Sequence, residues 1–300
     1  MSSADKKCAP GKKFIGNSCI SKSILNNIAN MLNNMFIKNE NDKIDINLNK
    51  KQLVSAITRT LSSYCSSQRC WTQLPIINNL NESSKEELHK STWLPNGPKG
   101  KHEWLSTTHI NDKLTQYHHV YPEFIFLGAV PLDFNDINQL GINNINFYEL
   151  CIKKKKSKIG IVFNHDTSNK GGSHWVSMYV DLLKGRINYF DSVGEPPKRE
   201  VKKLINKLIK ASYFILFKKK IDINNILFNC KHNRLIDPNL NKMDIRCNTN
   251  QHQFKGSECG VYSLHFIIES LKGRTFDDIT NDIVKDDHMN KNREDYFIIE

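Results

Sequence analysis

Three short runs in the middle of the chain constrain its fold more than any other feature. Residues 159–163, 175–180 and 186–190 are rich in β-branched and aromatic residues, which is typical of β-strands. Residues 181–185, between the last two runs, contain Asp and Gly and predict a hairpin turn. The sequence therefore predicts an antiparallel centre of a β-sheet.

Helical patterns lie on both sides of these runs along the chain. Residues 103–117, 195–211 and 259–271 each place apolar side chains at helical spacing. Further strand-like runs occur at 213–217 and 226–228. This order predicts an α+β fold with a central mixed or antiparallel sheet that is flanked by helices.

The first part of the chain has a separate helical pattern. Residues 21–32 and 53–61 predict two short amphipathic helices that face each other. A cluster of Pro and Gly at 95–100 follows and indicates a linker or exposed loop. We therefore predict an N-terminal helical arm at residues 1–92 and a second domain at 93–300. The arm either binds a partner or nucleic acid, or packs on the second domain.

Composition limits the class of protein. The chain has 300 residues, of which 39% are hydrophobic, and these values are typical of globular proteins. No run of about 18 apolar residues is present, so no membrane span is predicted. Residues 1–13 lack the apolar stretch of a secretory signal. The net charge of +12 favours an acidic partner such as nucleic acid, although the abundant lysine also fits an AT-rich genome.

Eight cysteines in such a chain predict free thiols in a reducing compartment rather than a disulfide framework. The pairs Cys8 and Cys19, and Cys65 and Cys70, do not have the spacing of zinc knuckles. A mixed Cys/His site that includes His89 is the lesser alternative. We therefore predict no metal site.

Four polar residues supply the groups that a thiol hydrolase needs. Cys259, followed by Gly260, lies at the predicted start of a helix, where backbone N–H groups stabilise a thiolate. His174 precedes one hairpin strand and Asp191 follows the other, so the open end of the hairpin brings the carboxylate to the imidazole. Gln253 lies just upstream and can donate an amide N–H to an oxyanion. We predict a catalytic set without metal or cofactor: nucleophile Cys259, base His174, orienting Asp191 and oxyanion donor Gln253.

The order and surroundings of these four residues resemble those of a known family. The residues that carry the likeness are His174-Trp175, Asp191 in Tyr-Phe-Asp-Ser, and Gln253 upstream of Cys259-Gly260. Residues 100–275 resemble the ubiquitin-like-protein (SUMO) proteases, a family of cysteine peptidases, and also the adenovirus-type proteases. The segments 166–176 and 257–263 are most similar to the African swine fever virus-type polyprotein-processing proteases of giant DNA viruses. The resemblance implies a papain-like or adenovirus-protease-like fold for the second domain.

The resemblance also implies cleavage after Gly-Gly. In the family two tryptophans enclose the diglycine of the substrate, and the matching residues are Trp104 and Trp175. Aromatic walls form a slot that only residues without a Cβ can enter. Two positions depart from the pattern, because Thr107 replaces an acid of many SUMO proteases and Glu258 replaces the usual Asp. The first departure weakens the case for SUMO recognition, and the second has little consequence.

The sequence thus predicts a viral cysteine endopeptidase that cleaves structural polyprotein precursors after Gly-Gly during virion maturation. A Gly-Gly-containing precursor would be its protein partner, and its basic surface would contact nucleic acid. It would act in the virion and at assembly sites in the host cytoplasm. One alternative is an isopeptidase that removes SUMO or ubiquitin from host conjugates. The other is a nucleic-acid-binding virion protein without enzymatic activity.

Overall fold

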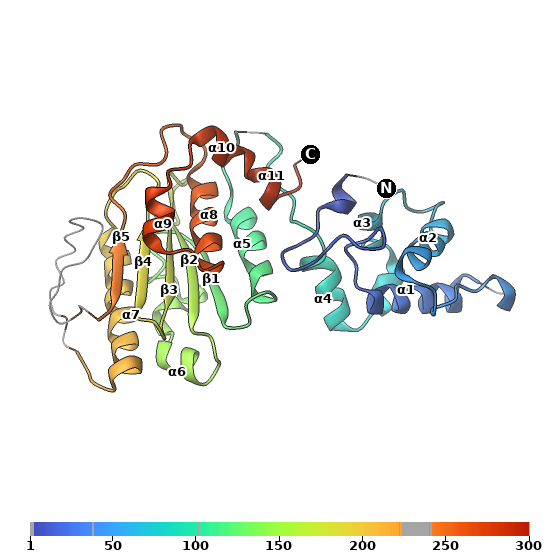
Figure 1. Ribbon diagram of the computed structural model, residues 1–300, viewed down its shortest axis with the longest axis horizontal. Coiled ribbons are helices and arrows are strands. Elements are labelled where there is room, and N and C mark those ends of the chain that lie inside the picture. Colours follow the sequence, from blue (N-terminus) through green and yellow to red (C-terminus); the bar gives the residue numbers. More distant parts are fainter. Residues whose placement is uncertain are drawn as a thin grey trace. The chain divides into compact units, whose positions relative to one another are not determined.

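The chain forms two compact units (Figure 1). The computed structural model describes residues 3–37, 39–100, 102–221, 223, 240 and 242–299. The first unit extends to Asn96 and also includes Tyr296–Ile298, and the second runs from Gly97 to Asp295. The predicted boundary lies between residues 92 and 93, whereas the first unit ends at Asn96. The first unit also contains the C-terminal residues Tyr296–Ile298, which were predicted to belong to the second domain. None of the described helices is long and apolar enough to cross a membrane.

The first unit is helical and has its own apolar core. Its helices are α1 (Lys22–Met35), α2 (Lys50–Thr60), α3 (Gln68–Trp71) and α4 (Glu82–Lys90). The predicted amphipathic helices are α1 and α2, and their apolar stripes meet in this core, where Leu25, Ile28 and Ile57 are fully buried. Asn49 begins α2 with a reciprocal capping box.

The prediction of free thiols is wrong in this unit. Cys8 is bonded to Cys19, and Cys65 is bonded to Cys70. The chain turns between the partners and brings their α-carbons to 5.3 and 5.6 Å, which is within the range that a disulfide can bridge. Sequence spacing does not show such turns. Among the described cysteines, Cys151 and Cys259 are free and buried.

The second unit is built on a five-stranded sheet. Its strands, in spatial order, are β1 (Phe124–Val130), β2 (Lys158–Asn164), β3 (Trp175–Asp181), β4 (Arg186–Phe190) and β5 (Asp244–Cys247). The three central strands are antiparallel, and each edge strand is parallel to its neighbour. The predicted α+β fold with a mixed central sheet is confirmed.

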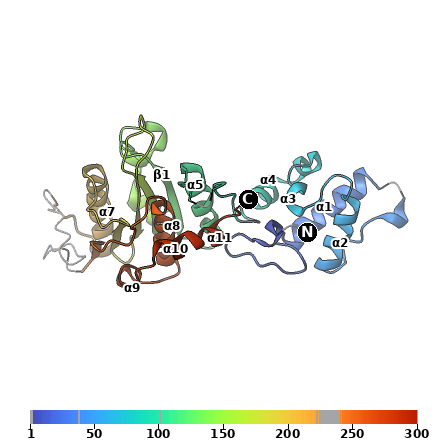
Figure 2. The same ribbon diagram turned by 90° about the horizontal axis from the view of Figure 1, so that it is seen from above.

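Helices cover both faces of this sheet (Figure 2). The helices of the unit are α5 (Thr107–Thr115), α6 (Phe147–Ile152), α7 (Arg199–Phe217), α8 (Cys259–Leu271), α9 (Phe276–Asn281), α10 (Asp286–Lys291) and α11 (Arg293–Tyr296). Alternate strand residues such as Ile161 and Met178 form one core with α6 and α7. On the other face, Phe190 of β4 stacks on Phe266 of α8, with ring centroids 5.0 Å apart. The buried helix α8 therefore crosses the face opposite α7.

Some elements differ from their predictions. The run 213–217 is not a strand but the last part of α7, because Ser212 and Ile215 continue the buried stripe of that helix. The same helix begins at Arg199 rather than at 195. Strands β1 and β5 were not predicted. The run predicted as a strand at 226–228 lies outside the described residues.

Gly160 makes close packing between the sheet and α8 possible. A Cβ there would lie 2.9 Å from Phe124 Cζ and 3.2 Å from Ile267 Cγ2. Phe124 is fully buried and has little room to move, so we expect Gly160→Ala to lower the free energy of unfolding by about 1–3 kcal/mol. Urea denaturation would measure this loss. Gly171→Ala is the matched control, because a Cβ there meets no atom within 4 Å, and equal stabilities of the two variants would contradict the packing argument.

Candidate active site

The predicted nucleophile lies at the first residue of α8. Cys259 follows the N-cap residue Glu258. Its backbone N–H is therefore one of the N–H groups in the first turn that have no intrahelical acceptor. The positive end of the helix dipole therefore faces the sulfur and favours negative charge on it. Although only 2% of Cys259 is exposed, the next residue has no side chain that could cover the thiol.

The structure brings His174 and Asp191 together with Cys259. His174 immediately precedes β3 and Asp191 immediately follows β4, and the register of Ser177 with Phe190 places these two strand ends side by side. The imidazole Nε2 donates a hydrogen bond to Asp191 Oδ1 at 2.7 Å. The imidazole also interacts with the Cys259 side chain as a hydrogen-bond partner.

These contacts decide the charge state of the imidazole. Burial lowers the pKa of His174, but the hydrogen bonds and charges of Asp191 and Cys259 more than offset it and raise the pKa to about 9. At neutral pH the imidazole is therefore protonated. An imidazolium that is hydrogen-bonded to a thiol favours the thiolate, which is the reactive form of cysteine.

Asp191 is completely buried, and two further side chains surround it. Asn248, just after β5, accepts a hydrogen bond from the Asp191 backbone N–H at 2.8 Å and donates one to its carbonyl oxygen at 2.6 Å. The Oδ1 atom of Asp191 also accepts from the Val193 N–H. On the other side, His165 Nε2 lies 4.0 Å from Oδ2, and burial lowers the pKa of His165 to about 4, so this second imidazole is neutral at pH 7. The backbone and carboxylate of Asp191 are thus fixed in place.

The side-chain amide of Gln253 is oriented by its neighbours. Its Oε1 accepts a hydrogen bond from Ser192 Oγ at 2.7 Å, and its Nε2 donates one to the Lys255 carbonyl. A primary amide has two N–H donors, so one remains available. Gln253 makes no hydrogen bond to Cys259 or His174, and its link to the other predicted residues is through Ser192, which follows Asp191.

Trp104 and Trp175 line one cavity of about 500 Å³, together with the loop at 166–172. Trp104 is 45% exposed, whereas Trp175 is 6% exposed and donates its Nε1–H to the Leu105 carbonyl at 2.8 Å. Leu105 also packs against the nucleophile turn, because a Cβ on Gly260 would lie 3.0 Å from Leu105 Cβ. The cavity therefore lies next to the turn that carries the thiol.

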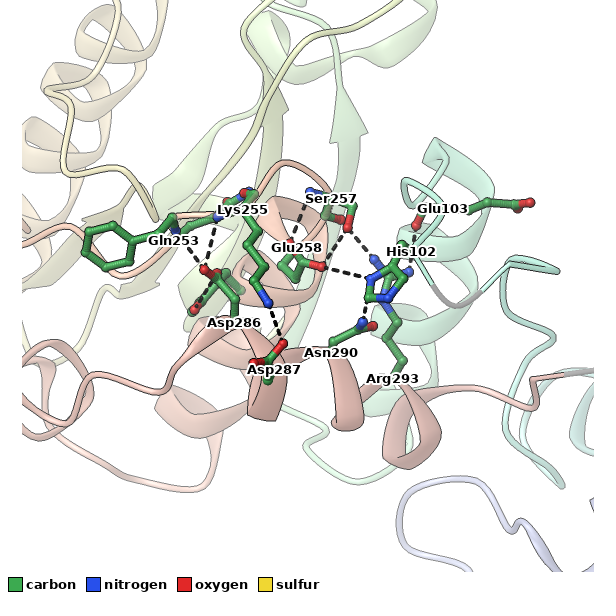
Figure 3. A network of polar contacts seen from close by, with 12 residues as sticks. His102, Glu103, Gln253, Lys255, Ser257, Glu258, Asp286, Asp287, Asn290 and Arg293 are labelled. Atoms are coloured by element: carbon green, nitrogen blue, oxygen red, sulfur yellow. Dashed lines mark hydrogen bonds and ion pairs between the residues drawn. The ribbon is translucent and has the colours of Figure 1, made fainter.

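Several residues around the site carried no recognisable signal in the sequence. Asn248 follows a strand that was not predicted, and His165 directly follows β2, where the sequence pattern indicated no functional residue. Asp286 was also missed, although its Oδ2 accepts hydrogen bonds from the backbone N–H groups of Phe254 and Lys255, as Figure 3 shows. These two bonds fix the loop between Gln253 and the nucleophile.

Comparison with known proteins identifies related proteases. Residues 152–300 match the Ulp1 protease family, C-terminal catalytic domain. A protein of Acanthamoeba polyphaga mimivirus that is named as a thiol protease is 33% identical over 257 residues, which are 85% of this chain and 77% of the relative. A SUMO-1 cysteine protease of African swine fever virus is 23% identical in an alignment of 270 positions that covers 83% of this chain and 89% of the relative.

The fold has a solved counterpart of nearly the same length. The crystal structure of a protease from African swine fever virus superposes with a TM-score of 0.65 at 19% identity, and the match covers 100% of this chain and 98% of the other. That likeness extends over both units of the chain. The mimivirus relative and the family match lead to one assignment: the chain is a viral cysteine protease and belongs to the Ulp1 protease family.

Proposed function

We propose that this protease cleaves structural polyprotein precursors after Gly-Gly, with Cys259 as the nucleophile. One observation carries the proposal: His174 interacts with both Cys259 and Asp191, and this triad lies beside a cavity lined by two tryptophans. The triad supplies an activated thiol and an oriented imidazole. The cavity supplies aromatic walls that select a thin segment of substrate.

The reaction would begin with attack of the Cys259 thiolate on the carbonyl carbon of the second glycine. The oxyanion that forms accepts hydrogen bonds from the free N–H of Gln253 and from the Cys259 backbone N–H. His174 then gives its proton to the leaving amine, and the thioester that remains is hydrolysed by water with the neutral imidazole as base. Asp191 keeps the ring oriented throughout.

The walls of the cavity give the substrate preference. A peptide that passes between Trp104 and Trp175 to reach the sulfur meets aromatic surface on two sides, and glycine is the residue with the smallest cross-section. The neighbouring loop carries Asp166 and Lys170, which line the same cavity, and we place the residues before the diglycine against them. We therefore place the Gly-Gly segment between the tryptophans.

Trp104 offers a test of this placement. Because it is 45% exposed, Trp104→Ala should cost little stability, but it should raise KM for a Gly-Gly-Xaa peptide by about tenfold through loss of one aromatic wall. Steady-state kinetics with the full-length protein measure the effect. Leu183→Ala, which removes another exposed apolar side chain of the same unit, should leave KM unchanged. An unchanged KM in the tryptophan variant would place the diglycine elsewhere.

One experiment separates the proposed function from its alternatives. The wild type and a Cys259→Ala control are incubated with a Gly-Gly-Xaa peptide, with SUMO conjugates and with ubiquitin conjugates. Cleavage of the peptide that depends on Cys259 supports precursor processing, and cleavage of the conjugates alone would favour an isopeptidase. If the wild type cleaves none of them, the proposal fails.

We further place this activity in the virion and at assembly sites in the host cytoplasm, a proposal supported by the viral origin of the relatives. The net charge of +12 favours contact with nucleic acid there. Binding to duplex DNA that weakens steeply with salt would support that contact, and binding that is absent at low salt would contradict it.

A further inference from the structure

Arg293, the first residue of α11, is a buried cation next to the nucleophile. Only 2% of it is exposed, and burial of a guanidinium is costly unless hydrogen bonds satisfy it. Its two terminal nitrogens donate to backbone carbonyl oxygens, one of Glu103 at 2.7 Å and one of Ser257 at 2.9 Å (Figure 3). One planar side chain thus joins two segments that are far apart in sequence.

These two segments form the two sides of the active site. Glu103 immediately precedes Trp104, a wall of the cavity, and Ser257 lies in the turn that leads into Cys259. The donors of a guanidinium have a fixed relative geometry, so both carbonyls are positioned at once. A change at Arg293 would therefore alter the spacing between the cavity wall and the sulfur.

The charge of Arg293 has a second consequence. Glu258 is 1% exposed, and its carboxylate accepts hydrogen bonds from the Ser257 backbone N–H and hydroxyl. A buried carboxylate beside Cys259 opposes formation of a thiolate by repulsion. Arg293 interacts electrostatically with both groups, Glu258 and Cys259, and its positive charge offsets this repulsion.

Other ionisable groups also surround this pair. Those that interact with Arg293, Glu258 or Cys259 include Glu103 and His102 before α5, His109 in α5, His174 before β3, Lys255 in the loop before Cys259, and Tyr262 in α8. His102 is mostly exposed, with Nδ1 3.7 Å from Glu258 Oε1, whereas Arg293 is enclosed. Among the described residues, Arg293 is therefore the cation that joins the buried carboxylate to both sides of the site.

We propose that Arg293 is a positioning residue for catalysis. Its two hydrogen bonds set the spacing between the Trp104 wall and the Cys259 turn, and its positive charge offsets the repulsion between Glu258 and negative charge on the sulfur. The spacing role rests on the proposed function, since it concerns the slot for Gly-Gly. The charge role concerns only the thiol and is independent of the substrate.

Two variants of the full-length protein separate these roles. Arg293→Met removes the charge and the donors, and Arg293→Lys retains a charge but cannot donate to both carbonyls in the same geometry. Arg274→Met is the matched control, because Arg274 lies at the surface with Asp282 and Glu269 as its partners. For each protein we would measure kcat and KM for a Gly-Gly-Xaa peptide. Peptide mapping would give the pH dependence of Cys259 alkylation by iodoacetamide.

In Arg293→Met the pH of half-maximal alkylation should rise by about one unit, because an opposite charge near the thiolate is lost. In Arg293→Lys that pH should stay at the wild-type value, while KM rises by about tenfold. The Arg274→Met control should match the wild type in both measurements.

The proposal is overturned if both Arg293 variants keep the wild-type alkylation profile and KM and differ only in Tm. If Arg293→Met does not fold, the KM of Arg293→Lys decides, and a wild-type value overturns the spacing role. Absence of Gly-Gly cleavage by the wild type would contradict the proposed function instead, because alkylation requires no substrate.

Discussion

Asp191→Asn should lower kcat/KM for a Gly-Gly-Xaa peptide by about 10³- to 10⁴-fold, the size of the loss when a triad carboxylate becomes an amide. The carboxylate orients His174 through the 2.7 Å hydrogen bond and stabilises its charged form. The amide of Asn has no negative charge, and its N–H₂ group cannot accept a proton from the ring. The base would therefore lose both its orientation and its electrostatic support.

The same substitution should change the pH profile in one direction. Asp191 helps to raise the pKa of His174 to about 9, so the wild type keeps its imidazolium up to that pH and loses activity above it. Without the carboxylate, burial lowers the pKa of His174, and the alkaline limb of kcat/KM moves to lower pH. Rates measured between pH 5 and 10 would show this. Asp136→Asn, a change at an exposed loop residue, is the control. If Asp191→Asn keeps the wild-type kcat/KM and the alkaline limb of its pH profile does not move, the assigned role of Asp191 is ruled out.

Gln253→Ala should reduce kcat by about 10²- to 10³-fold, which corresponds to about 2.7–4 kcal/mol of transition-state stabilisation. In the wild type Gln253 Oε1 accepts from Ser192 and one N–H of Nε2 donates to the Lys255 carbonyl. The substitution removes the second N–H of Nε2, which is the one available to the oxyanion. Since the oxyanion exists only during the reaction, KM should change little. Single-turnover and steady-state rates would measure the loss.

This variant also separates the oxyanion donor from the thiolate. His174 and the start of α8 activate Cys259 without help from Gln253, so alkylation of Cys259 by iodoacetamide should keep its wild-type rate in Gln253→Ala. Gln139→Ala, at an exposed position in the same unit, should keep both alkylation and peptide cleavage. If alkylation falls together with kcat, Gln253 supports the turn rather than the oxyanion.

Local sequence patterns were sufficient to predict the centre of this fold. The β2, β3 and β4 runs are short, apolar and separated by clear turns, and α8 is almost entirely buried along its length, so periodicity and composition identify them. Because hairpin geometry fixes which strand ends meet, His174 and Asp191 could be expected to lie together. The sequence therefore contained the core of the site.

The remaining features depend on contacts between distant segments. The apolar run at 213–217 is compatible with either a strand or a helix, and its packing with the stripe of α7 decides the outcome. The disulfides of the first unit depend on turns between the cysteines. Asn248 and Arg293 act on backbone groups many residues away, Asp191 in one case and Ser257 in the other. A hydrogen bond to a backbone carbonyl or N–H places little constraint on the residue type of the partner. Such a bond therefore cannot be recognised from the amino-acid sequence.

The central claim is that Cys259 is the nucleophile and that His174 activates it. Its most direct test is labelling of the full-length protein by a peptide that ends in Gly-Gly and has a vinyl sulfone in place of the scissile bond. The modified cysteine is located by peptide mapping. We expect labelling of Cys259 but not of Cys151, the other free cysteine of the described residues, and loss of this labelling in a folded His174→Ala variant. Labelling at Cys151, or undiminished labelling of Cys259 without His174, would contradict the claim.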